Sequence, residues 1–193
     1  MLFTNSSLAR ATANFEIVCK KACSDEELKE LKRSDFRAAL TRGDFEKIKY
    51  YIDNKIFSAN DVVFDRYLDT PLSISAYFGG PKSVKIVEYL IDNGADVNQV
   101  VKGAATTPLL TAIWKKNNEV AKLLLMKGAD INIKSDRGYD ACIFSHRWSN
   151  FEIMAKIPGC CERIYNIESS DKLPVDRLRP LEFMRSCGNL IMK

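Results

Sequence analysis

Histidine is the side chain most often used for acid–base catalysis, and this chain of 193 residues contains one, His146. A serine–histidine or cysteine–histidine site would have to use it. His146 stands beside Arg147 in a stretch that we expect to form a short helix, and no nucleophile motif accompanies it. We therefore interpret it as a structural or surface residue, and we expect the protein not to be an enzyme.

Cysteine is the next candidate for chemistry, and the chain has six: Cys19, Cys23, Cys142, Cys160, Cys161 and Cys187. Their spacing contains no Cys-x-x-Cys pair, and one histidine cannot complete the usual zinc pattern. The pair Gly79-Gly80 is not part of a phosphate-binding loop, because no glycine-rich run of that kind follows a strand. We expect buried thiols, no metal and no cofactor.

The composition favours a folded chain without a membrane span. Apolar residues make up 46% of the sequence, and 29 basic against 25 acidic residues give a net charge of only +4. No apolar run approaches the roughly 18 residues that a spanning helix needs. The first residues lack a basic leader followed by an apolar segment, so we expect an intracellular, cytoplasmic protein with reduced cysteines.

Two sequence motifs each occur twice in the chain, and the two copies are separated by about the length of one pair of short helices. "GADVN" at 94–98 recurs as "GADIN" at 128–132, and "TPLSISAYFGG" at 70–80 recurs as "TPLLTAIWKKN" at 107–117. These motifs resemble the ankyrin repeat family, whose unit is about 33 residues long and opens with Thr-Pro-Leu-His. The resemblance implies two short helices and a hairpin loop in each unit.

Diverged copies flank the clear pair, since residues 35–54 and 136–157 keep the helical apolar pattern but lack Thr-Pro-Leu. The resemblance implies an all-α ankyrin-repeat solenoid over 34–157. Its repeats are expected at 34–65, 66–99, 103–134 and 135–157.

Single residues give the expected start, end and core of each unit. Thr70 and Thr107 precede a proline and suit helix starts, while Gly94 and Gly128 suit helix ends. We expect the second helices to bury one continuous stack of side chains: Val87, Leu90, Val120, Leu124 and Ile153.

The two ends of the chain are expected to be helical caps, over 1–33 and 158–193. Residues 6–22 have an apolar face, and "SDEELKELKR" at 24–33 combines a Ser24–Glu27 capping box with acids first and bases last. The stretch "LPVDRLRPLEFM" is similar to the start of the F-box-like tails of some viral ankyrin proteins. The alternative to a plain cap is therefore a docking tail at 173–190, which would make the protein a substrate adaptor of a ubiquitin ligase.

The family commonly binds partners on its concave side, through hairpin tips and the last positions of each first helix. Carried over to this sequence, the resemblance implies the following partner-binding residues: Arg42, Arg66, Tyr67, Tyr77, Phe78, Trp114, Lys115, Lys116, Arg137, Tyr139, Arg147 and Trp148. Lys116 stands where the family usually has glycine. Trp114 and Trp148 are 34 residues apart, so both fall on this face.

A face that is both aromatic and basic favours a partner protein with an acidic segment and apolar anchors. We therefore expect a monomeric protein–protein interaction module that acts as a scaffold, an inhibitor or a host-directed effector. Nucleic acid could stack on the same aromatic residues, but the small net charge and the lack of a nucleic-acid motif disfavour it.

Overall fold

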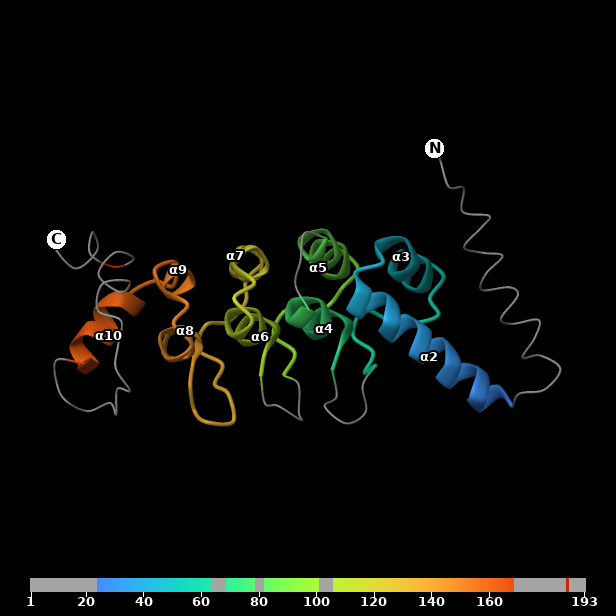
Figure 1. Ribbon diagram of the computed structural model, residues 1–193, viewed down its shortest axis with the longest axis horizontal. Coiled ribbons are helices and arrows are strands. Elements are labelled where there is room, and N and C mark those ends of the chain that lie inside the picture. Colours follow the sequence, from blue (N-terminus) through green and yellow to red (C-terminus); the bar gives the residue numbers. More distant parts are fainter. Residues whose placement is uncertain (1–23, 64–68, 79–81, 101–105, 169–186, 188–193) are drawn as a thin grey trace.

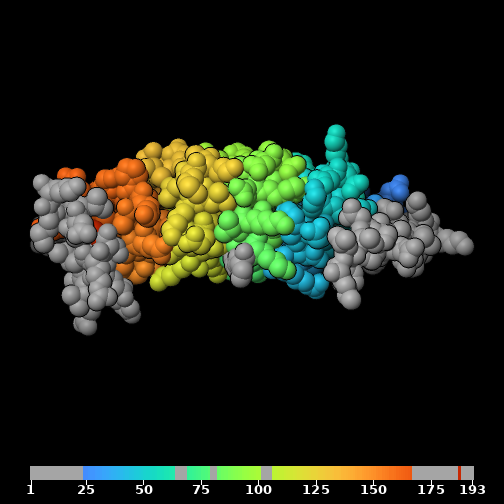
Figure 2. Space-filling model, turned by 90° about the horizontal axis from the view of Figure 1, so that it is seen from above, coloured from blue at the N-terminus to red at the C-terminus, as the bar shows by residue number. Residues whose placement is uncertain are grey.

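A computed structural model describes residues 24–63, 69–78, 82–100, 106–168 and 187. The helices within these ranges are α2 (Asp25–Arg42), α3 (Phe45–Asp53), α4 (Pro71–Phe78), α5 (Ser83–Asp92), α6 (Pro108–Trp114), α7 (Asn118–Met126), α8 (Ala141–Arg147), α9 (Phe151–Met154) and α10 (Cys160–Glu168). Figure 1 shows α3, α5, α7 and α9 in one row above α4, α6 and α8, with α10 at the C-terminal end. The repeats stack along one axis, and the molecule is elongated (Figure 2).

The expected starts and ends of the clear repeats are confirmed. The Thr107 hydroxyl accepts a hydrogen bond from the Leu110 amide at 3.2 Å, and the Thr70 hydroxyl accepts one from the Ser73 amide at 3.3 Å. Gly94 and Gly128 have φ angles of 86° and 87°, in the left-handed region where glycine has no steric cost. Local capping therefore sets the length of each helix.

The apolar core is one cluster that runs through the stack. All five residues expected there, Val87, Leu90, Val120, Leu124 and Ile153, are fully buried. This confirms the predicted register of the second helices.

Asparagine side chains join neighbouring repeats through the loops, a feature that the sequence patterns did not predict. The Asn60 side chain donates to the Gly94 carbonyl at 2.7 Å and accepts from the Asp96 amide at 2.8 Å. One repeat later, the Asn98 side chain accepts from the Asp130 amide at 2.8 Å. Each loop is thus bonded to the loop of the following repeat.

The helix expected at 24–33 is confirmed but does not end there. The Ser24 amide donates to the Glu27 carboxylate at 2.8 Å, and the Glu27 amide donates to the Ser24 hydroxyl at 3.3 Å, which forms the capping box. From there α2 continues for 18 residues to Arg42, as a single helix through the proposed cap boundary at residue 33. The amphipathic stretch 6–22 lies outside the described residues.

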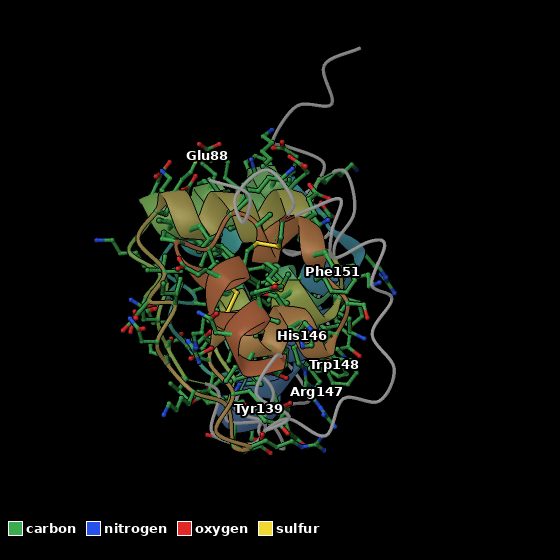
Figure 3. All side chains as sticks on the ribbon, turned by 90° about the vertical axis from the view of Figure 1, so that its left-hand side faces the viewer. Glu88, Tyr139, His146, Arg147, Trp148 and Phe151 are labelled. Carbon is green, nitrogen blue, oxygen red and sulfur yellow. A yellow bond between two sulfur atoms is a disulfide. The ribbon has the colours of Figure 1, made fainter. Side chains whose placement is uncertain are left out.

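The expectation of reduced thiols is wrong for four cysteines. Disulfides join Cys142 to Cys160 and Cys161 to Cys187, and they are the yellow bonds in Figure 3. Sequence spacing could not reveal them, because Cys142 meets Cys160 only when α10 folds back onto α8, and Cys187 must likewise return to Cys161 of α10. Cys19 and Cys23 lie outside the described residues.

An ion pair also holds α10 on the last repeat. The Asp140 carboxylate accepts from the Ile143 amide at 3.0 Å, which caps α8, and it pairs with Arg163 of α10 at 2.7 Å. Asp140 is buried, so removing Arg163 would leave its charge without this partner.

The tail at 173–190 that would dock a ubiquitin ligase lies outside the described residues, apart from Cys187.

We predict that Leu124→Ala lowers the free energy of unfolding by roughly 2–5 kcal/mol, because truncating a fully buried leucine removes apolar burial and leaves a cavity. Urea unfolding measures this loss. The matched control is Met126→Ala on the same helix, because Met126 is 77% exposed and its truncation should be nearly neutral. Equal effects of the two changes would contradict the core register.

We predict that digestion of the oxidised protein without reductant yields the peptide containing Cys160 and Cys161 linked to the peptides of Cys142 and Cys187. Partial reduction and alkylation, followed by fragmentation between Cys160 and Cys161 in the mass spectrometer, should assign the linkages as Cys142–Cys160 and Cys161–Cys187. Reduction should lower the free energy of unfolding by roughly 2–4 kcal/mol per bridge, because the unfolded chain loses a closed loop. Crossed linkages between Cys142 and Cys161 would contradict the arrangement of α8 and α10.

Candidate functional site

Large aromatic side chains stand exposed where the inner helices end. Tyr77 and Phe78 close α4, Trp114 closes α6 and Trp148 follows α8. Their exposed fractions are 38%, 52%, 42% and 37%, although almost all other residues of these helices are buried. The helix ends project beyond the packed core, so these four side chains face solvent.

The four aromatic rings form one continuous row, which we call the aromatic ladder: Phe78, Tyr77, Trp114 and Trp148. The ring centroid of Tyr77 lies 5.0 Å from Phe78 and 5.8 Å from Trp114. The Trp114 centroid lies 6.1 Å from Trp148. These spacings are those of favourable aromatic pairs, so the rings support each other across three repeats.

Phe144 supports the end of the ladder and was missed by the sequence interpretation. Its ring centroid lies 6.0 Å from that of Trp148, and its side chain is buried in the core. The signal was present, because residues four apart on a helix share a face. The buried Phe144 ring therefore limits the movement of the Trp148 side chain.

Lys115 lies on the ladder itself. Its ammonium nitrogen is 3.9 Å from the ring centroid of Tyr77 and 4.4 Å from that of Trp114. Both distances are within the range of cation–π attraction. One lysine thus places a positive charge at the middle of the aromatic row.

The structure describes five further expected binding residues outside the ladder. Arg147 lies 5.4 Å from the ring centroid of Tyr139, which is half-buried. Figure 3 shows Tyr139, Arg147 and Trp148 on the opposite side of the stack from Glu88 of α5. Arg42, Lys116 and Arg137 are exposed.

Two of the expected binding residues, Arg66 and Tyr67, lie outside the described residues. The structure therefore brings together Tyr77, Phe78, Trp114, Lys115 and Trp148, and it pairs Tyr139 with Arg147. Within the described ranges, no ring contact joins Arg42, Lys116 or Arg137 to the ladder.

The turns after the inner helices share one backbone conformation. Gly43, Lys116 and Ser149 occupy equivalent places and have φ angles of 66°, 55° and 52°. Lys116 and Ser149 adopt this left-handed conformation without being glycine, at a cost of roughly 1 kcal/mol each. The packing of the repeats therefore imposes the left-handed conformation in this turn even where the residue is not glycine.

His146 has a structural setting. It lies half-buried on α8, as expected, and its ring centroid is 6.3 Å from that of Phe151 on α9. Burial lowers the pKa of His146 below its usual value, because the charged imidazolium loses hydration. The side chain packs between the two helices of the last repeat.

A family model described as ankyrin repeats, in three copies, matches residues 36–135, just over half of the chain. The chain belongs to the ankyrin repeat family. The pair α8 and α9 follows this match and adds a further helix pair to the stack. Ankyrin repeats are generally protein–protein interaction modules, and the family is typically non-catalytic.

Relatives come from animals, a virus and a bacterium. The rat "Ankyrin repeat and SAM domain-containing protein 6" is 32% identical over 112 residues, which cover 58% of this chain and 12% of the rat protein. An ankyrin repeat protein of fowlpox virus is 26% identical over 173 residues, covering 81% of this chain and 24% of its own length. One from Rickettsia felis is 30% identical over 127 residues, covering 61% and 54%.

This ankyrin chain thus spans between 12% and 54% of the length of these three relatives. Among the residues that the structure describes, none of the helices has the length and apolar character to cross a membrane.

We predict that His146 makes the fold less stable in mild acid. The unfolded chain binds a proton near pH 6.5, whereas the folded chain resists protonation until lower pH, so the free energy of unfolding falls as the pH drops through that value. Denaturant unfolding at about pH 7.5 and about pH 5.5 measures this. His146→Gln is the control variant, and its loss on acidification should be smaller than that of the parent protein. A parallel loss in both would contradict the assignment.

Proposed function

We propose that this ankyrin chain is a non-catalytic binding module that holds a partner protein on the aromatic ladder and its surrounding cations. The observation that carries the proposal is the continuity of four exposed rings across three repeats. Scattered exposed apolar residues are ordinary, but a contiguous apolar strip framed by polar residues is typical of an interaction site.

The residue types of the ladder suit strong binding. Tryptophan, tyrosine and arginine dominate binding hot spots, and the two aromatic types bury a large area with few freely rotating bonds. The contact between the rings of Trp114 and Trp148, and that of Trp148 with the buried Phe144, already restrict the rotation of both tryptophan side chains. These two side chains would therefore lose little conformational entropy when a partner docks, and more of the buried area would appear as affinity.

The charges around the ladder favour an acidic partner. The described cations among the expected binding positions are Arg42, Lys115, Lys116, Arg137 and Arg147, against the acidic Asp69 and Asp136 at positions of the same expected face. This excess would attract an acidic segment during encounter, and the effect would weaken with salt. We propose a protein partner with an acidic segment and apolar anchors, and a monomeric binding module.

The relatives support a scaffold, an inhibitor or a host-directed effector, since two of them come from a virus and a bacterium. We propose that the chain acts in the cytoplasm. The two disulfides would have to persist there against cellular reductants, and the burial of Cys142, Cys160, Cys161 and Cys187 limits the access of reductants to them.

We predict that Trp114→Ala and Trp148→Ala each weaken partner binding by roughly 2 kcal/mol or more, because each removes a large exposed ring of the ladder. The partner is captured with the parent protein, identified, purified and titrated calorimetrically against each variant. Circular dichroism first establishes that the variants fold.

The control for these variants is Met126→Ala, which removes an exposed apolar side chain of α7 outside the ladder and should leave binding unchanged. Parent-like affinity in both tryptophan variants would refute the ladder as the binding surface and would place the site in another part of the chain.

A further inference from the structure

We infer that the ladder binds an extended acidic segment whose apolar residues alternate, and that Lys115 determines this preference. The inference rests on the proposed function and specifies the partner of the same surface. It follows from where the Lys115 ammonium lies and from the spacing of the rings.

Lys115 already occupies the place where a partner's cation would bind. Its ammonium lies over the rings of Tyr77 and Trp114, at 3.9 and 4.4 Å from their centroids. An incoming lysine or arginine would have to displace it and would meet its positive charge. The central rings therefore disfavour basic ligands, although bare aromatic faces attract them.

The same ammonium offers a partner's carboxylate a ready counter-ion. Within the described ranges, no acidic side chain forms an ion pair with Lys115. The two rings shield one side of the ammonium from water, which strengthens a charge-assisted hydrogen bond on its open side. A carboxylate flanked by apolar side chains fits this arrangement.

The ring spacing suits a chain in extended conformation. Adjacent repeats place their rings 5.8 and 6.1 Å apart. In an extended segment, alternate residues point the same way and lie roughly 6.6 Å apart, since each residue advances about 3.3 Å. Alternating apolar residues would therefore meet successive rings.

Cations on and next to the ladder disfavour a helical ligand. The exposed Lys115 lies over the rings of Tyr77 and Trp114, and the exposed Arg147 directly precedes Trp148 in the sequence. A docked amphipathic helix presents a broader apolar stripe, with contacts at positions i, i+3, i+4 and i+7. Part of that stripe would lie against cations, whereas a single row of alternating side chains would not.

The first test needs no partner, because Trp114 and Trp148 are the two tryptophans of the chain. Iodide, caesium and neutral acrylamide each quench tryptophan fluorescence. A positive charge near the rings raises quenching by the iodide anion relative to quenching by the caesium cation. In Lys115→Gln the iodide-to-caesium quenching ratio should fall roughly twofold, with acrylamide quenching unchanged. An unchanged ratio would show that Lys115 does not set the local charge.

The second test uses short synthetic peptides and the same fluorescence. A peptide that alternates leucine with glutamate should bind. One terminal leucine is replaced by a charged residue to keep the peptide soluble. Its lysine counterpart should bind at least roughly tenfold more weakly, and Lys115→Glu should weaken the acidic peptide by a similar factor. Lys156→Glu is the control, because Lys156 is exposed just after α9, outside the ladder, and its charge reversal should leave the affinity unchanged.

A third peptide has the same composition with leucines at helical spacing. Tighter binding of this peptide than of the alternating one would overturn the extended geometry. Equal binding of the lysine and glutamate peptides would overturn the role of Lys115. Either result could coexist with loss of partner binding in the tryptophan variants, so this inference can fail while the proposed function stands.

Discussion

Burial between neighbouring repeats is the constraint on which this ankyrin chain depends, because a pair of short helices cannot cover its own apolar faces. Helix α6 shows how few of its residues are free of this requirement. Of its seven residues, the six from Pro108 to Ile113 are buried, and Trp114 is left outside. The helix end is thus where a residue can change without disturbing the stack, and that is where the ladder lies.

Backbone geometry holds these exposed positions in place. The helix stops at Trp114, and the chain reverses immediately through the left-handed Lys116. On the other side of the repeat, the Asn60 and Asn98 side chains tie successive loops together. A ring at the end of an inner helix therefore has a fixed origin and direction before any partner arrives, which is the condition for a preorganised binding surface.

Much of the fold could be predicted from the sequence, because the signals are local. Thr107 with Pro108 marks a helix start, Gly128 marks a helix end, and Leu124 falls on the apolar face between them. Sequence also placed Trp114 and Trp148 on one face, since equivalent positions of stacked units must align. Their ring contact follows from that register.

The features that were missed depend on contacts that no local pattern encodes. Six cysteines allow many pairings, and only the return of α10 onto α8 brings Cys142 to Cys160. Lys115 could have extended into solvent, and its place over Tyr77 depends on a neighbouring repeat. The continuity of α2 was missed because the capping box was interpreted as a separate cap, although no glycine or proline interrupts the chain near Arg33.

The ladder also has a mechanical consequence, because its rings belong to different repeats. A stack in which each unit touches mainly its neighbours bends at the junctions between units. Bending at the junction of α4 with α6, or of α6 with α8, would change the distances of 5.8 and 6.1 Å between the rings. A ligand that bridges the rings would resist that change. The curvature of the solenoid and its affinity for a ligand are therefore coupled, so that tension on either end would act on the bound partner.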